Sequence, residues 1–523
     1  MGRSIILPQH DMNYVRNQVF AGGDQDKDIG VPQIFYCHNV MPTEQGYQSV
    51  GYNQVIAPVV GAKDFDQAIP LSDFNGNKYL YVPAAGKNYI FDAPNLVWAN
   101  YSAILNLPNN VLTTTAFVQG VQYIYYANNG CYMYNNTTKN FDAVALTGLI
   151  AANIIGIVGA NGYLLAWDIN GILYWSSATT PTDFIPSLVT GASSGNITDL
   201  KGRVVVVLPA NNGIIIYATG NAVGGTFTGN LRFPFNLKEI PGSGGLRDKE
   251  HVSYESNLEE HYALTTAGLQ QLTKTSCKTL HSEVADFLTN RVFEDYNDIT
   301  QIFTTTYLTG DLKIKVAIIS ARYFVISYGI SIFTHALIYD LVQKKWGKLR
   351  ITHVDCFQYN YPNLYGSVTY DMLLSLGTTY DDLADTMYQD LDSAVASAER
   401  PRRNIGFLQL DGTVQVLSFD LGALNHSAVF LLGRYQFARQ DYMQLLGFEI
   451  ENIDQNSNFA AFVLPSYDGK NFSTPVVPYL NNGAGLLREY RCRVTAVNHC
   501  LLFVGTFNFC STLLRYLNAG KIR

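Results

Sequence analysis

The sequence predicts an all-β protein: a β-propeller of about six or seven blades, followed by a C-terminal β-sandwich-like domain and preceded by an extended N-terminal arm. Three observations predict this class. Pairs of apolar segments joined by glycine turns recur along the chain. The composition is rich in Tyr, Phe, Val, Ile and Thr with frequent Gly and Asn, which favours strands and tight turns. Towards the C-terminus the recurrence is lost and alternating segments take over.

The recurring unit is two apolar runs separated by a glycine turn. Four copies are FNGNKYLYVPAAGKNYIF, VQGVQYIYYANNGCYMY, ANGYLLAWDINGILYW and LKGRVVVVLPANNGIIIY. Their leading glycines are Gly76, Gly120, Gly162 and Gly202, and their turn glycines are Gly86, Gly130, Gly171 and Gly213. The copies follow one another at about 40 to 44 residues, which is the period of a propeller blade. Continuous apolar runs suit strands that are covered on both faces by neighbouring blades.

Weaker copies extend the pattern around Gly268, through the stretch 322–350 and around Gly412. They bring the expected total to six or seven blades, with the phase of the repeat left open. An ordinary all-β domain built from hairpins remains the alternative, because WD40 and kelch signatures are absent.

Domain boundaries follow from where the repeat begins and ends. Residues 1–45 lack it and are expected to form the extended arm. The propeller is expected over 46–420, with an insert at 378–404 where acidic residues interrupt the β pattern. From residue 421 to 523 the alternation suits a small β-sandwich.

Charge and composition limit the function. Charged residues are only 15% of the chain and apolar residues 47%, so we expect partner subunits to cover much of the surface. The net charge is −7, whereas a protein that grips phosphates is usually basic. A conduit through which DNA slides without sticking remains compatible with this charge.

The seven cysteines are widely spaced and form no C-x-x-C pair. This pattern indicates reduced, mostly buried thiols rather than a zinc site or a disulfide framework. The first twenty residues lack the apolar core of a signal peptide, and no stretch of about 18 uncharged apolar residues indicates a membrane helix.

Motifs for catalysis are missing: no G-x-S-x-G, Walker loop, H-E-x-x-H or EF-hand loop occurs. We therefore expect no enzyme activity and no catalytic, cofactor-binding or metal-binding residues. His251 and His261 lie in an acidic stretch that suits a surface loop better than a cation site. Ser466 to Gly469 resembles a sialidase box but occurs once, where an Asp-Gly hairpin explains it.

Two basic clusters and one tyrosine run remain to be interpreted. The basic clusters are Lys344, Lys345, Lys348 and Arg350, and Arg400, Arg402 and Arg403. Solvated charge is the preferred interpretation, followed by contact with a subunit or a tail fibre and then by DNA binding. The tyrosines are Tyr123, Tyr125 and Tyr126, which suit the core of a blade better than a platform for stacked bases.

The segment from Leu173 to Leu246 carries a resemblance. It contains, in order, Tyr-Trp-Ser-Ser, Pro-Thr-Asp-Phe, Thr-Gly-Ala, a Leu-Lys-Gly strand, Ile-Tyr-x-x-Gly-Asn, Phe-Pro-Phe and Gly-Gly-Leu. The C-terminal region adds Ser-Tyr-Asp-Gly, Tyr-Arg-Cys-Arg-Val-Thr, Val-Asn-His and a final Gly-Lys-Ile-Arg. Together these resemble the tail nozzle, or head-to-tail stabilisation (tail hub), proteins of short-tailed bacteriophages. The first 45 residues and the insert at 378–404 have no counterpart in this resemblance.

The resemblance implies a virion structural protein that assembles in the host cytoplasm as a ring, typically a homohexamer, below the portal and its adaptor ring. Such a ring extends the DNA channel of the short tail tube, retains packaged double-stranded DNA without sequence specificity, and opens for ejection during host entry. Tail fibre or tail tip proteins are the further partners it implies, and no membrane partner is expected. The alternative is a carbohydrate-binding or glycan-cleaving propeller, which needs paired carboxylates that face each other.

Overall fold

The described part of the chain is built almost entirely from strands. A computed structural model describes residues 3–7, 34–44, 46–59, 65–72, 78–84, 87–92, 97–100, 114–126, 130–135, 137–138, 140–254, 259–281, 292–297, 302–307, 312–359, 405–419, 428–435, 441–452, 457–467, 473–482 and 487–521. These residues form strands and two short 3-10 turns, η1 (Ala151–Asn153) and η2 (Lys249–His251). None of their helical segments could span a bilayer. The expected all-β class is confirmed, while the insert at 378–404 lies outside the described residues.

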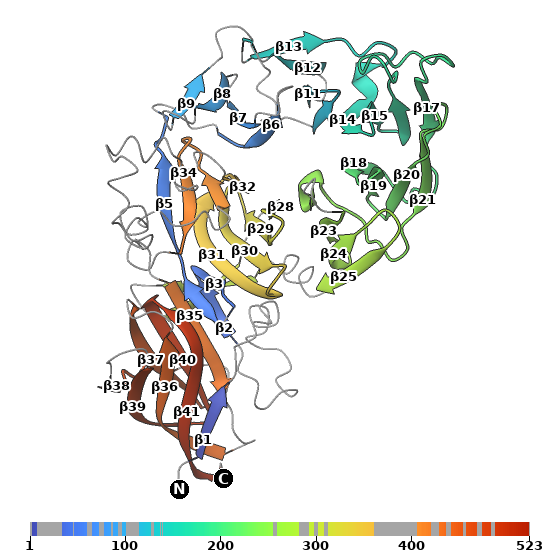
Figure 1. Cartoon of the computed structure of the whole chain (residues 1–523). Helices are drawn as coiled ribbons and strands as arrows, with labels where there is room; N and C mark the ends of the chain where they lie inside the picture. Colours follow the sequence, from blue (N-terminus) through green and yellow to red (C-terminus); the bar gives the residue numbers. More distant parts are fainter. Residues whose placement is uncertain are drawn as a thin grey trace, which may run out of the picture.

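Seven four-stranded blades are arranged in a ring within the described residues (Figure 1). The first three blades are β6 (Ile69–Ser72), β7 (Lys78–Ala84), β8 (Lys87–Asp92) and β9 (Val97–Asn100); β10 (Thr114–Val118), β11 (Val121–Tyr126), β12 (Gly130–Asn135) and β13 (Asn140–Val144); and β14 (Ile154–Ala160), β15 (Tyr163–Asp168), β16 (Ile172–Trp175) and β17 (Ser193–Asn196). Blades four and five are β18 (Val204–Ala210), β19 (Gly213–Ala218), β20 (Ala222–Phe227) and β21 (Phe235–Glu239), and β22 (Val252–Tyr254), β23 (His261–Thr265), β24 (Gly268–Leu272) and β25 (Cys277–His281).

Blade six follows a separate hairpin, and blade seven uses a strand from the N-terminal part of the chain. The hairpin is β26 (Val292–Asn297) and β27 (Ile302–Tyr307), and blade six is β28 (Lys313–Ile319), β29 (Tyr323–Gly329), β30 (Phe333–Asp340) and β31 (Lys345–His353). Blade seven is β32 (Asp355–Gln358), β33 (Ile405–Leu408), β34 (Val414–Ser418) and β5 (Gly51–Ile56). Since β5 pairs with β34 as the last strand of this blade, the two ends of the ring are joined by main-chain hydrogen bonds.

Apolar clusters fill the space between successive blades all the way round the ring. Blades one and two share Ile69 and Tyr126, and blades two and three share Tyr125 and Leu164. A larger cluster runs through blades three, four and five. Two others join blade six to blade seven and blade seven back to blade one. The first strands of blades two, three and four lie next to one another, as do those of blades five, six and seven, so these strands surround the ring centre.

The glycine repeat is confirmed as a signal for blades, but its alignment is wrong in the fourth copy. Gly120 and Gly162 close the turn between the first and second strands of their blades, with φ of 81° and 84°. In the fourth copy Asn211 and Asn212 form this turn, with a φ of 51° at Asn212, while Gly213 begins β19 and Gly202 precedes β18. The phase slipped by one strand because every strand of a blade is apolar and is followed by a similar turn.

A single eleven-stranded sheet connects the propeller to the C-terminal domain. Blade six continues from β31 into β3 (Val40–Pro42), β4 (Tyr47–Ser49), β41 (Asn508–Lys521), β36 (Asp441–Asn452), β39 (Leu487–Ala496) and β38 (Tyr479–Asn482), with β1 (Arg3–Leu7) also on β41. Against this sheet lies a second one: β2 (Ile34–His38), β35 (Ala428–Tyr435), β40 (Asn498–Thr506) and β37 (Asn458–Ser466). The two sheets form the expected sandwich, which Figure 1 shows below the ring of blades.

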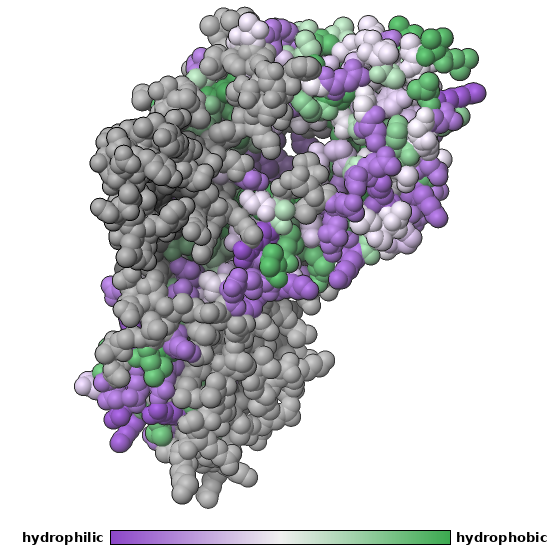
Figure 2. Space-filling model, in the orientation of Figure 1, coloured by the Kyte–Doolittle hydropathy of each residue, from purple (hydrophilic) through white to green (hydrophobic). Residues whose placement is uncertain are grey.

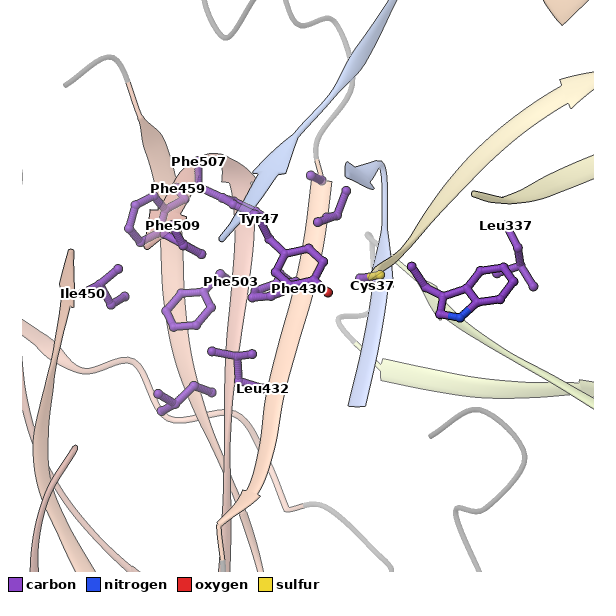
Figure 3. Packing of buried hydrophobic residues seen from close by; sticks show 14 of the residues in the cluster. Cys37, Tyr47, Leu337, Phe430, Leu432, Ile450, Phe459, Phe503, Phe507 and Phe509 are labelled. Carbon is purple, nitrogen blue, oxygen red and sulfur yellow. The ribbon is translucent and has the colours of Figure 1, made fainter. Parts of the chain in front are cut away.

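Propeller and sandwich also share a hydrophobic core. Figure 3 shows Cys37 between the aromatic side chains of the sandwich and Leu337 of blade six. On the sandwich side Phe507 and Phe509 stack with their ring centroids 4.4 Å apart. On the propeller side Trp346 belongs to the same cluster and is 2% exposed. Because the sheet and the core are both continuous, the two domains form one body rather than two units on a linker.

The described N-terminal residues are extended strands that lie against the body of the protein. Of the range 1–45, Arg3–Leu7 pairs with β41, Ile34–His38 pairs with β35, and Val40–Pro42 pairs with β4 and β31. These short strands belong to the C-terminal sheets, and the chain then enters the propeller through β5. Residues 8–33 lie outside the described part of the chain.

Candidate functional site: two exposed apolar surfaces and a charged ring centre

The outer side of blades three and four carries a group of exposed hydrophobic side chains. We call it the knob, and it consists of Ile185, Leu188, Val189, Leu231 and Phe233. Leu188 and Val189 are 85% and 89% exposed. Figure 2 shows hydrophobic colour gathered at the upper right, over the region of these blades. Soluble monomers rarely expose such a contiguous apolar group, which therefore indicates an interaction surface.

The loop between β16 and β17 holds the knob in a fixed conformation. The Ser187 hydroxyl accepts hydrogen bonds from the backbone N–H groups of Val189 and Thr190 at 3.2 and 3.3 Å. The Trp175 indole N–H donates to the Gly191 carbonyl at 2.9 Å. Beneath the loop Phe184 is 2% exposed and anchors it in the core. The exposed tip is thus rigid before any partner binds, which reduces the entropy lost on binding.

A second loop, between β20 and β21, completes the knob. The Thr228 hydroxyl donates to the Phe233 carbonyl at 2.6 Å, and the Arg232 backbone N–H donates to the Asn230 side chain at 2.8 Å. The Arg232 guanidinium lies over the Phe233 ring, 5.5 Å from its centroid. Leu231 packs closely on Gly191: a Cβ atom added to Gly191 would lie 3.2 Å from the Leu231 side chain. The two loops therefore form one surface.

A second exposed apolar surface lies on the sandwich. We call it the edge run, and it consists of Val476, Val477, Tyr479 and Leu480. Val476 exchanges two backbone hydrogen bonds of 2.8 Å with Val463 of β37. Tyr479 and Leu480 begin β38, which pairs with β39 on one side and is the last strand of its sheet among the described residues. The run thus crosses the side of the sandwich from one sheet to the other.

Charged groups gather at the ring centre where blades five, six, seven and one meet. The Lys315 ammonium lies 2.7 Å from the Asp355 carboxylate, which is 1% exposed. The same carboxylate accepts hydrogen bonds from the backbone N–H groups of Ala68 at 2.7 Å and Cys356 at 2.8 Å. Three donors from three blades therefore converge on Asp355. With its oxygens occupied in this way, Asp355 fastens the ring.

Around this ion pair the electrostatics are unusual. Burial raises the pKa of the Glu250 carboxyl and lowers the pKa of the neighbouring Lys249. Burial alone would lower the pKa of Lys315, but the charges of Asp355 and Glu250 raise it. Tyr254 is 37% exposed, yet burial raises the pKa of its hydroxyl to about 12.

The candidate residues from the sequence analysis are mostly buried in the structure. Tyr123, Tyr125 and Tyr126 are at most 4% exposed and confirm the interpretation as core. His261 is buried, not on a surface loop: it contacts the Tyr217 hydroxyl at 3.0 Å and the Pro209 carbonyl at 2.9 Å. No group of three or more potential metal ligands occurs among the described residues. The six cysteines whose side chains are described form no disulfide with one another, and four of them are buried.

The interpretation of the first basic cluster as solvated charge is wrong for Lys345 and Lys348, whereas Lys344 and Arg350 are exposed. Lys345 and Lys348 are 8% and 1% exposed, because β31 is an interior strand that pairs with β30 on one side and with β3 on the other. The Lys345 ammonium lies over the Tyr47 ring at 5.9 Å, and the Arg350 backbone N–H donates to Asn39 at 3.1 Å. This cluster belongs to the junction between propeller and sandwich. The second basic cluster lies outside the described residues.

Comparisons with known proteins found no matching family model and no matching curated protein. One similar solved structure is an extracellular domain assigned to a hybrid two-component system of B. thetaiotaomicron, with 13% identity, a TM-score of 0.37, and coverage of 71% of this chain and 42% of that chain. Another is an extracellular domain assigned to a one-component system of the same organism, with 10% identity, a TM-score of 0.38, and coverage of 85% and 48%. The chain spans less than half the length of either. Similarity at this level carries no argument about function.

Replacing Asp355 by Asn tests the role of the central ion pair. The substitution leaves the Lys315 ammonium without its buried partner, so we expect the free energy of unfolding to fall by roughly 3 kcal/mol. Chemical denaturation followed by tryptophan fluorescence measures this change. Glu239→Gln is the matched control, because it breaks the exposed ion pair with Lys201 on the surface, and it should leave stability unchanged. Equal effects of both variants would contradict a special role for the ring centre.

Buried histidines make stability depend on pH. Burial lowers the pKa of His261, His353 and His499 from 6.5 to about 4. The unfolded chain therefore binds these protons at a higher pH than the folded chain, and stability falls as the pH drops from about 6.5 towards 4. Each histidine contributes about 3 kcal/mol to the loss by pH 4. Calorimetric unfolding temperatures between pH 7.5 and 4 should decline, and His261→Gln should make the decline shallower; an unchanged profile in that variant would refute the assignment.

Proposed function

We propose that this chain is a ring-forming structural protein of a short bacteriophage tail, the nozzle that extends the DNA channel below the portal and its adaptor ring. The observation that carries the proposal is the knob. It is an exposed, rigid apolar surface, and it lies inside the Leu173 to Leu246 segment on which the resemblance to tail nozzle proteins rests. An apolar surface fixed in advance is expected of a subunit that associates permanently with its neighbours.

Two further properties support the proposal. Propeller and sandwich are joined by one sheet and one core, so a subunit can transmit force without bending between its domains. The net charge of −7 gives a ring of such subunits a mildly repulsive field for DNA. Packaged DNA can then pass without being held by its phosphates. On this proposal six copies form the ring, and tail fibre or tail tip proteins bind below it.

A glycan-binding or glycan-cleaving propeller is the competing proposal, and it would use the ring centre. Glu250 supplies an acid there, since it interacts electrostatically with Lys315 and Asp355. Glycoside hydrolysis needs a second free carboxylate, and Asp355 already accepts from Lys315 and two backbone N–H groups. The described residues around Lys315 therefore favour a structural fastening over a catalytic pair.

Replacing Leu188 by Asp tests the proposed ring. A charge at the tip of the knob opposes burial in an interface, so we expect the assembled protein to dissociate into monomers whose unfolding temperature is unchanged. Size-exclusion chromatography with light scattering measures the mass. Ile169→Asp is the matched control, since Ile169 is 58% exposed and lies in the turn between β15 and β16, outside both loops of the knob, and it should leave the assembly intact.

The virion tests the tail assignment. Phage particles complemented with Leu188→Asp should lack the nozzle and lose their DNA, as seen by electron microscopy, whereas the Ile169→Asp protein should complete the tail. A wild-type protein that stays monomeric at high concentration and never joins a particle would overturn the proposal.

A further inference from the structure

We propose that Lys315 and Asp355 join through an isopeptide bond, an amide between their side chains that forms within the folded chain with loss of water. Glu250 is assigned as the group that moves the protons. The bond ties β28 of blade six to β32 of blade seven and closes a covalent loop that contains the rest of blade six. The inference does not depend on the proposed function, because it concerns the chemistry of three side chains in one subunit.

The two reacting groups are held in contact by neighbouring strands. The Lys315 Nζ atom lies 2.7 Å from the Asp355 Oδ1 atom, so the nitrogen is beside the carboxyl carbon to which Oδ1 is bonded. The two side chains are 15% and 1% exposed. They come from β28 and β32, the first strands of their blades, which lie next to each other. Groups held together in this way react as if at an effective concentration of about 10⁵–10⁸ M.

Two backbone N–H groups are directed at the carboxyl group that is attacked. The Ala68 N–H donates to Asp355 Oδ2 at 2.7 Å, and the Cys356 N–H donates to Oδ1 at 2.8 Å. When an amine adds to a carboxyl carbon, negative charge develops on the carboxyl oxygens. Backbone donors at these distances stabilise such an oxyanion. The contacts that hold Asp355 in the ring centre are therefore also suited to activate its carboxyl carbon.

Burial favours the product over the starting pair. The Asp355 and Glu250 carboxylates raise the pKa of Lys315 against the effect of burial, so the reaction starts from an ammonium and a carboxylate. Two protons of the ammonium leave with one oxygen of the carboxylate as water, and the remaining nitrogen and carbonyl form a neutral amide. No atom is oxidised or reduced. Replacing two buried charges by an amide removes the cost of keeping them away from water.

Glu250 is placed to move these protons. It belongs to η2, which lies against β28, and the Ile318 backbone N–H of β28 donates to the Ser253 hydroxyl at 3.0 Å just after this turn. Burial raises the pKa of Glu250, and the charges of Lys315 and Asp355 also act on it. A carboxyl group with a raised pKa both takes and gives protons readily near neutral pH. Glu250 can thus accept a proton from the attacking nitrogen and return it to the departing oxygen.

Burial distinguishes this pair from the other lysine–carboxylate pairs of the described residues. Lys201 and Glu239 lie 2.6 Å apart, but their side chains are 64% and 35% exposed. Lys313 and Asp66 lie 3.4 Å apart and are 34% and 48% exposed. Water hydrates both charges in such pairs, so condensation gains nothing there. We expect these two pairs to remain ionic, and the Lys201 pair serves as the matched control.

Mass spectrometry of the full-length, denatured protein tests the bond. We expect the wild-type chain to be lighter than its sequence by one water molecule, and Lys315→Arg to have its full sequence mass. Lys201→Arg, which removes the exposed pair, should keep the loss of water. Trypsin does not cut after an acylated lysine, so digestion should release a branched peptide in which residues 314–322 are joined through Lys315 to the peptide that begins at Ile351.

Glu250→Gln tests the proton carrier, because it keeps the size of the side chain and removes the titrating group. We expect this variant to form the bond roughly a hundredfold more slowly, the usual contribution of general acid–base catalysis. Circular dichroism confirms that it and Lys315→Arg are folded. An unchanged rate in Glu250→Gln would overturn the role of Glu250.

Two results would overturn the bond itself. One is a folded wild-type protein that keeps its full sequence mass after prolonged incubation. The other is a loss of water that persists in Lys315→Arg, since this would place the dehydration elsewhere in the chain. Neither result bears on the nozzle proposal, which the assembly of Leu188→Asp tests separately.

Discussion

The junction between β31 and β3 is the interaction on which the rest of the structure depends. There Val40 pairs with Lys348, and blade six continues into the outer sheet of the sandwich. Without this pairing the propeller and the sandwich would be two domains on a linker, free to move as most domain pairs are. With it, and with the core around Cys37 and Trp346, the distance between the knob and the edge run is fixed. A subunit that must repeat the same contact around a ring needs such a fixed distance.

Ring closure is the second constraint, and it uses the same short N-terminal region. The chain supplies β2, β3 and β4 to the sandwich sheets and then β5 to blade seven. Asp355 completes the closure from inside, since it binds groups of blades six, seven and one. Polar groups at the centre thus replace part of the apolar packing that joins blades farther out.

Local signals in the sequence predicted the blades and the sandwich. Asn-Gly turns between apolar runs, such as Asn161-Gly162, require positive φ at both residues, and the structure has 50° and 84° there. Signals of this kind depend only on neighbouring residues, so the sequence reveals them directly. These signals do not reveal which strand of a blade each apolar run forms, because the apolar runs of all strands look alike.

Long-range pairing was beyond the sequence. The Ser49 hydroxyl donates to the Phe507 carbonyl at 3.1 Å across 458 residues, and nothing in the local pattern of residues 34–56 announces such partners. Lys348 was assigned to solvent for the same reason, since only the sheet junction makes it interior. The knob was also missed. The segment Ser187 to Gly191 has the composition of an ordinary turn. Only the structure shows that hydrogen bonds to Ser187 hold this turn with Leu188 exposed.

Electron cryomicroscopy of the purified, assembled protein tests the central claim most directly. The claim is that a rigid propeller–sandwich body forms a closed ring of identical copies. We expect a ring in which every subunit keeps the same angle between propeller and sandwich. Single subunits in which the two domains adopt many relative orientations would contradict the account.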